Sequence, residues 1–198
     1  MKAAPSYLRK VINLTLFTLT VFAIAFGALG IFLARAQAYA LVNPARTRWI
    51  TQPNAYGLIN VEDVRFTTSE DIGITAWYVR PQEGSGAVMV YVHGLGSNRG
   101  ELLDVAALLH DRLGVGALLI DLRNHGESGE SITTLGLNEV TDVRAAVEFL
   151  LTCTEVDPGR IGLMGMSMGG ATVIRAAARI PEVSWVIAQS AYTSLTDN

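Results

Sequence analysis

The chain has 198 residues and a formal net charge of −3; 50% of its residues are hydrophobic and only 17% are charged. This length suits one domain of ordinary size. A weakly acidic chain offers no basic face, so nucleic acid is not expected as a partner. The single cysteine, Cys153, excludes an internal disulfide and a zinc site built on several thiolates, and we expect it to be a packing residue.

The excess of apolar residues lies near the N-terminus. Residues 1–10 form a short basic tail, and Val11 to Ala34 follow as 24 residues without a charge. As a helix with a rise of about 1.5 Å per residue, this segment would span about 36 Å, which is enough to cross the hydrocarbon core of a bilayer. The sequence therefore predicts a single-pass transmembrane helix over residues 11–34.

Two questions about this segment stay open. A cleaved signal peptide is the alternative to an anchor, because Ala36-Gln37-Ala38 and Ala38-Tyr39-Ala40 are small-x-small cleavage sites. Basic residues are equally frequent on both sides of the helix, so the positive-inside rule does not decide its orientation. The very short N-terminal tail favours a domain outside the cytoplasm.

After the anchor, residues 35–60 show no sustained periodicity and are expected to form a juxtamembrane connector. An antiparallel hairpin follows, with strands over residues 64–67 and 74–79. Four continuous apolar runs then have the composition of strands that are buried on both faces. These runs cover residues 88–92, 117–120, 161–164 and 185–188.

Helical patterns alternate with the apolar runs. Apolar residues recur at helical spacing over residues 102–113 and 140–150, and a third apolar helix covers residues 168–180, just before Pro181. This alternation predicts an α/β fold, with a mostly parallel sheet and helices on both faces. Functional groups collect at the carboxyl ends of the strands in such sheets.

The third apolar run ends in Gly165-Met166-Ser167-Met168-Gly169, which fits the pattern G-x-S-x-G between a strand and a helix. In that setting the serine occupies a tight turn that lifts its side chain clear of the sheet and strains its backbone. Gly165 and Gly169 leave room for neighbouring backbone to cross closely. The motif therefore predicts Ser167 as a nucleophile, and a merely structural glycine-rich turn is the alternative.

The first apolar run ends in His93-Gly94-Leu95-Gly96. A backbone N–H after this strand can join the N–H of the residue that follows the nucleophile, and together they bind an oxyanion. The candidate donors are the backbone N–H groups of Leu95 and Met168. We expect His93 to brace the loop through hydrogen bonds, and we expect His110, in the next helix, to be a surface residue.

The second apolar run ends in a polar loop over residues 121–129, which contains Asp121, Arg123 and His125. A charged active-site cluster is one interpretation of this loop. Loops of this composition more often hold themselves together by local hydrogen bonds between side chains and backbone. The structural role is therefore favoured, for His125 as well.

Three motifs occur in an order and spacing that resembles the α/β-hydrolase superfamily: His93-Gly94, Asp121-x-Arg123-x-His125-Gly126-x-Ser128 and Gly165-x-Ser167-x-Gly169. The resemblance runs from about Val64 to the end of the chain. The hairpin and the anchor look most like membrane-anchored esterases and prolyl-oligopeptidase-like members. The resemblance implies hydrolysis of an ester, thioester or amide through an acyl-enzyme, with no cofactor and no metal; an acyltransferase is a close variant.

The sequence after Ser167 does not contain the acid and the base that such a site requires, in the order in which this fold places them. In this fold both follow the serine along the chain, yet the only acids after Ser167 are Glu182 and Asp197, and all three histidines precede it. We therefore expect residues 61–198 to be a truncated, poorly stable and nearly inactive domain with an unprotected apolar edge at Trp185-Val186-Ile187. The chain is either a fragment of a longer protein, which the intact motif favours, or a degenerate protein.

Taken together, these features predict a membrane-anchored serine hydrolase that acts on a small-molecule or lipid-like acyl substrate. The alternative is a non-catalytic, membrane-tethered interaction module built on the same fold.

Overall fold

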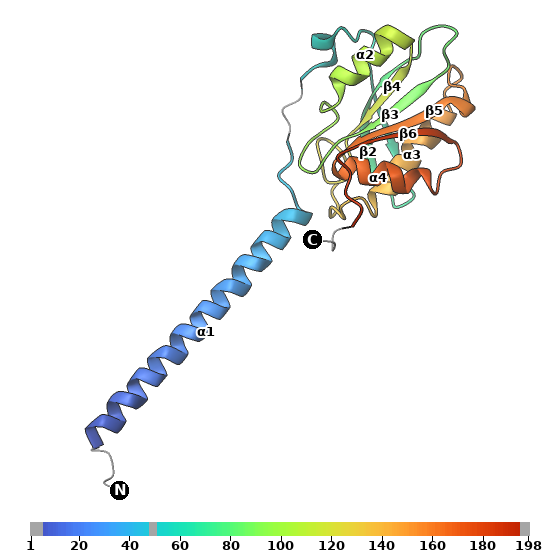
Figure 1. The fold of residues 1–198 in the computed structure, drawn as a ribbon. Helices are drawn as coiled ribbons and strands as arrows, with labels where there is room; N and C mark the ends of the chain where they lie inside the picture. The colour runs from blue at the N-terminus through green and yellow to red at the C-terminus, as the bar shows by residue number, and fades with distance from the viewer. Residues whose placement is uncertain (1–5, 48–50, 195–198) are drawn as a thin grey trace. The chain divides into compact units, whose positions relative to one another are not determined.

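The computed structural model describes residues 6–47 and 51–194. The chain divides into two compact units, Met1–Leu41 and Val42–Asn198. The first unit contains a single helix and the second contains the α/β domain (Figure 1).

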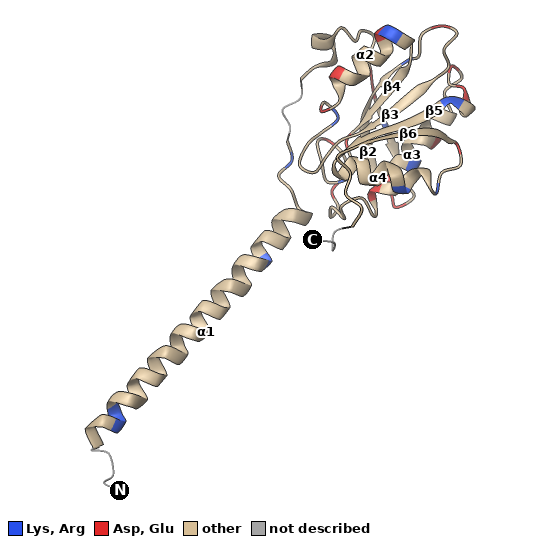
Figure 2. Cartoon of the chain, viewed as in Figure 1, with Lys and Arg blue, Asp and Glu red and all other residues tan. Residues whose placement is uncertain are grey.

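Helix α1, Ser6–Val42, is longer than the predicted segment of residues 11–34. It continues through Ala36, Ala38 and Ala40, because alanine is the residue with the highest helix propensity. None of its residues is buried, and its most apolar window has a mean hydropathy of 2.4. The helix is uncharged between the basic residues near its start and Arg35 (Figure 2). It is thus long and apolar enough to cross a membrane, a property that a signal sequence shares.

The second unit is built on a six-stranded sheet with the order β1-β2-β4-β3-β5-β6. The predicted hairpin is confirmed, because β1 pairs with β2 in antiparallel register. Strands β4, β3, β5 and β6 are parallel to one another, and β2 pairs with β4 in antiparallel register. The strands are β1 Glu62–Thr67, β2 Gly73–Val79, β3 Val88–Val92, β4 Gly116–Ile120, β5 Ile161–Met166 and β6 Val183–Gln189.

Helices cover both faces of this sheet, as predicted (Figure 1). Helix α2, Leu103–Leu113, packs on one face; α3, Glu139–Leu151, and α4, Met168–Ala177, pack on the other. Side chains of a strand alternate between its two faces. In β3, Val88, Val90 and Val92 accordingly join the core under α3 and α4, whereas Met89 and Tyr91 join the core under α2.

Two details differ from the sequence-based expectation. Within the predicted connector, Pro53–Tyr56 forms a short 3-10 helix, and the following Leu58 is buried in the core under α2. Helix α4 ends at Ala177 instead of residue 180. A second 3-10 turn, Pro158–Arg160, precedes β5, where the side chain of Asp157 accepts a hydrogen bond from the N–H of Gly159.

Strand β6 lies at the edge of the sheet. Three successive apolar side chains of this strand are 36–44% exposed: Trp185, Val186 and Ile187. The predicted apolar edge is therefore present in the structure.

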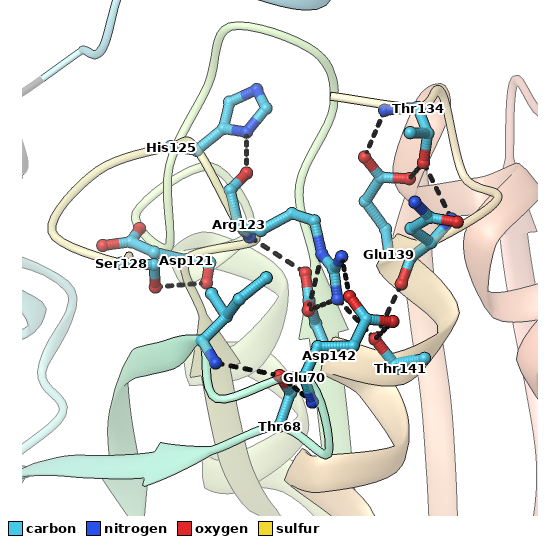
Figure 3. A network of polar contacts seen from close by, with 12 residues as sticks. Thr68, Glu70, Asp121, Arg123, His125, Ser128, Thr134, Glu139, Thr141 and Asp142 are labelled. Carbon is cyan, nitrogen blue, oxygen red and sulfur yellow. Dashed lines mark hydrogen bonds and ion pairs between the residues drawn. The ribbon is translucent and has the colours of Figure 1, made fainter. Parts of the chain in front are cut away.

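The loop after β4 is held by a network of buried polar side chains (Figure 3). The carboxylate of Asp121 accepts hydrogen bonds from the backbone N–H groups of Arg99 and Glu127, at 2.7 and 2.9 Å. It also pairs with the Arg99 guanidinium. A Cβ on Gly126 would lie 2.1 Å from Oδ2 of Asp121, so only glycine fits there. This loop is structural, as the sequence indicated.

Arg123 is the centre of the second half of this network (Figure 3). Its Nε and Nη2 donate to the fully buried carboxylate of Asp142, on α3, at 3.0 and 2.9 Å. Asp142 also accepts from the backbone N–H of Arg123 at 2.9 Å. The pair ties the end of β4 to α3, and Glu70 binds the outer side of the guanidinium.

Two buried histidines join the loops after β3 and β4. Nε2 of His93 accepts from the N–H of Leu122 at 3.0 Å, and its Nδ1 lies 2.7 Å from the carbonyl oxygen of Gly94. Nε2 of His125 accepts from the N–H of Gly96 at 3.1 Å, and its Nδ1 lies 2.9 Å from the carbonyl oxygen of Arg123. Both rings are therefore neutral, with the proton on Nδ1, and brace the loops as predicted.

Burial lowers the pKa of both histidines. For His93 it lowers the pKa from 6.5 to about 4, and the neighbouring ring of His125 adds to the shift. The unfolded chain therefore takes up these protons at a higher pH than the folded chain.

We expect the substitution Asp142→Asn to destabilise the domain by about 3 kcal/mol, because it leaves the buried Arg123 charge without its main partner. Urea unfolding in detergent, followed by tryptophan fluorescence, measures the change. The matched control is Asp111→Asn in the exposed pair with Arg112, for which the expected change is within about 0.5 kcal/mol. Equal effects of the two substitutions would contradict this role for the buried pair.

We expect His93 to make folding less stable in acid. Its contribution is complete above its unfolded pKa of 6.5 and falls by about 3 kcal/mol as the pH drops to the folded value of about 4. The measurement is the free energy of unfolding against pH for the wild type and for His93→Gln. The difference between the two proteins should change over this pH range; parallel curves would refute the assignment.

Candidate active site

Ser167 occupies a strained turn between β5 and α4. Its backbone has φ 53° and ψ −115°, in a region that residues other than glycine rarely adopt. The residue itself is exposed, whereas its neighbour Met168 is buried. The turn thus lifts Ser167 away from the sheet, as the G-x-S-x-G motif predicts.

Two glycines make this turn sterically possible. A Cβ on Gly165 would lie 2.2 Å from the carbonyl oxygen of Gly169, and a Cβ on Gly169 would lie 2.1 Å from the carbonyl oxygen of Val92. The first turn of α4 therefore crosses directly over the end of β3. Close approach of this kind requires residues without a side chain.

The turn is also held from the neighbouring strand. The N–H of Ser167 donates to the carbonyl oxygen of Gln189, the last residue of β6, at 2.8 Å. The carbonyl oxygen of Ser167 accepts from the N–H of Ala171 at 3.0 Å, which joins the serine to the first turn of α4. The backbone of Ser167 is thus fixed on both sides while the residue itself stays exposed.

The loop after β3 lies beside Ser167. A Cβ on Gly94 would be 3.5 Å from Cβ of Ser167, so the next residue, Leu95, is in the same neighbourhood. Met168 is the first residue of α4, and the first four N–H groups of a helix have no partner within it. The structure thus brings both candidate donors to the strand ends around Ser167.

Glu101 is a residue of this loop that sequence reasoning missed. Its carboxylate accepts a hydrogen bond from the N–H of Gly94 at 2.6 Å, which fixes the turn that carries Leu95. A glutamate nine residues after the end of a strand has no periodic signal. Glu101 could have been found only by looking for an acidic residue that can accept a hydrogen bond from the backbone of the His-Gly turn.

The three histidines are not placed to accept the Ser167 proton. Both ring nitrogens of His93 and of His125 are engaged with backbone groups. His110 lies in α2 and is partly buried rather than on the surface; its Nδ1 is 3.1 Å from the carbonyl oxygen of Val115, just before β4 begins. It therefore lies at the amino-terminal edge of the parallel strands, opposite Ser167.

The acidic candidates do not complete the site either. Glu182 lies just before β6, again at the amino-terminal edge of the parallel strands, and Asp197 falls outside the described residues. Among the residues that the structure describes, no group of three or more His, Cys, Asp or Glu side chains could hold a metal ion. Cys153 is partly buried and packs against the core under α3, where burial raises the pKa of its thiol.

We expect the substitution Gly169→Ala to prevent the elbow from forming, because the new methyl group would collide with the backbone of β3. The expected result is a loss of at least 2 kcal/mol in the free energy of unfolding, measured by urea titration. The matched control is Gly159→Ala, whose Cβ would make only an ordinary contact, 3.4 Å from Asp157. A Gly169→Ala protein as stable as this control would contradict the geometry described here.

Comparison with known proteins identifies the family to which the chain belongs. The model of the alpha/beta hydrolase family matches residues 89–195. An uncharacterized protein of Mycobacterium tuberculosis is 32% identical over 136 residues, which cover 68% of this chain and 47% of that protein. A thiohydrolase of Aspergillus aculeatus is 34% identical over 108 residues, 53% of this chain and 34% of that enzyme.

Solved structures agree with this assignment. An esterase of Pyrococcus furiosus superposes with a TM-score of 0.68 at 30% sequence identity, over 76% of this chain and 57% of the esterase. The chain spans about half the length of the curated relatives it matches, or less. The family match covers more than half of the chain and includes the turn at Ser167, and the chain therefore belongs to the alpha/beta hydrolase family.

Proposed function

We propose that this chain carries the nucleophile and the oxyanion-binding groups of a membrane-anchored serine hydrolase. In this account Ser167 attacks the carbonyl carbon of an ester, thioester or amide and forms an acyl-enzyme, which water then hydrolyses. The strained conformation of Ser167 is the single observation that carries the proposal, because such strain persists only where the surrounding structure enforces it.

The proposed oxyanion hole consists of the backbone N–H groups of Leu95 and Met168. Attack by Ser167 converts the trigonal carbonyl into a tetrahedral intermediate and places a negative charge on its oxygen. Two fixed N–H donors and the positive end of the α4 dipole would stabilise this charge without reorganising. The Glu101 carboxylate supports this role by taking the N–H of Gly94, which holds the turn that presents Leu95.

A general base is required in addition. A serine hydroxyl at neutral pH is a weak nucleophile until a neighbouring group takes its proton. His93 and His125 use both ring nitrogens to brace the loops, and His110 lies at the opposite edge of the sheet. We therefore propose that the base is a histidine that is not among these 198 residues, which match only about half the length of the chain's relatives. An acid from the same source would orient it, as in the Ser-His-Asp arrangement.

The substrate class follows from the family and from the anchor. The relatives include an esterase and a thiohydrolase, which supports chemistry at an acyl carbon. The length and composition of helix α1 support attachment to a membrane, and the very short N-terminal tail favours a domain outside the cytoplasm. We propose an acyl substrate that is a small molecule or a lipid. The second candidate function is a non-catalytic, membrane-tethered interaction module, which the exposed apolar edge at Trp185–Ile187 favours.

We expect a fluorophosphonate probe to label Ser167 in the protein isolated from its native membrane. Peptide mass spectrometry locates the label, and Ser167→Ala should abolish it. Residues 1–198 expressed by themselves should react about 10²–10⁴-fold more slowly, because a general base contributes about that factor. A native protein that is folded yet unlabelled at Ser167 would favour the interaction module.

A further inference from the structure

A short segment that begins at Val42, the last residue of α1, is hydrogen-bonded to the loops of the candidate site. We name residues 42–47 the strap; it belongs to the second compact unit, which begins at Val42. The sequence predicted these residues to be part of a juxtamembrane connector without sustained periodicity. In the structure they make hydrogen bonds to the loops that follow both β3 and β4.

The first contacts of the strap fix the loop after β4. The carbonyl oxygen of Val42 accepts from the N–H of Thr133 at 2.8 Å and from the side-chain amide of Asn124 at 3.3 Å. Asn124 has a positive φ of 61°, a conformation that asparagine tolerates better than most residues, and the bond to Val42 holds its side chain. Four residues after Val42, Nη1 of Arg46 donates to the carbonyl oxygen of Ser128 at 3.0 Å.

The last residue of the strap reaches the loop that carries Leu95. The hydroxyl of Thr47 donates to the carbonyl oxygen of Gly96 at 2.8 Å. The backbone carbonyl of Thr47 accepts from the side-chain amide of Asn98 at 3.2 Å. Gly96 is therefore held on one side by Thr47 and on the other by His125, which accepts from its N–H at 3.1 Å.

We propose that Arg46 and Thr47 are positioning residues for the oxyanion-binding loop, an inference that rests on the proposed function. Thr47 holds the carbonyl oxygen of Gly96, the residue after Leu95, and Arg46 holds the loop that carries His125. Gly96 has φ 74°, a conformation that glycine adopts without steric cost, and the bonds from Thr47 and His125 fix the position of its peptide groups. The strap thus makes the geometry of the Leu95 donor depend on the segment that leaves the membrane helix.

The Nη2 atom of Arg46 provides a second observation about this residue. The atom is buried, and it has no hydrogen-bond partner among the described residues. A buried donor without a partner lowers stability, so stability alone does not explain the position of Arg46. Its guanidinium also disfavours a proton on His125, which must stay neutral to accept from Gly96.

The test uses the protein isolated from its native membrane, and variants expressed in the same host. We expect Thr47→Val to lower the maximal rate of fluorophosphonate labelling at Ser167 about tenfold, because a misplaced catalytic donor costs up to about 10²-fold. The half-saturating probe concentration should change less than twofold. Thr47→Ser, which keeps the hydroxyl, should restore the rate, and Arg46→Gln should resemble Thr47→Val.

Two controls separate positioning from general damage. Thr154→Val alters an exposed threonine after α3, beyond the amino-terminal edge of the parallel strands, and should leave the labelling rate unchanged. Hydrogen exchange of the peptide that contains Leu95 and Gly96 should accelerate in Thr47→Val, whereas exchange in β3 should not. Unchanged exchange and labelling in Thr47→Val would overturn the inference. Faster exchange in a protein that never labels Ser167 would support the strap and reject the proposed hydrolase.

Discussion

The close crossing of α4 over the end of β3 is the constraint on which the candidate site depends. Gly169 approaches Val92 so closely that an added Cβ would lie 2.1 Å from the carbonyl oxygen. This contact fixes where α4 begins, and it thereby imposes the turn that strains Ser167. The hydrogen bond from Ser167 to Gln189 then fixes the same turn from β6. An exposed serine is thus held by a backbone that has little freedom to relax.

The loops around this serine are built mainly from buried polar groups, and the charged groups at their centre pair with partners of opposite charge. Asp121 holds the loop after β4, and Arg123 joins that loop to α3 through Asp142. His93 and His125 act as neutral bridges between neighbouring strand ends. Removing one partner would leave a buried charge or donor unsatisfied, which costs more than the intact pair contributes. The histidines of this chain are therefore better understood as braces than as catalysts.

The sequence predicted the sheet, its helices and the elbow because these features depend on local patterns. Continuous apolar runs such as Val88–Val92 indicate buried strands, and glycines around Ser167 indicate a close crossing. Glu101, Arg46 and Thr47 were missed, since a side chain that binds distant backbone leaves no periodic trace. The helix end at Val42 was also missed, because an alanine-rich segment continues a helix beyond its apolar part.

The central claim is that Ser167 forms a covalent intermediate, and trapping that intermediate is the most direct test. The protein isolated from its native membrane would be mixed with a slowly hydrolysed nitrophenyl ester, quenched in acid and digested. The account predicts that mass spectrometry finds the acyl group on the peptide that contains Ser167, and that Ser167→Ala carries none. Hydrolysis of the ester by a Ser167→Ala protein at the wild-type rate would contradict it.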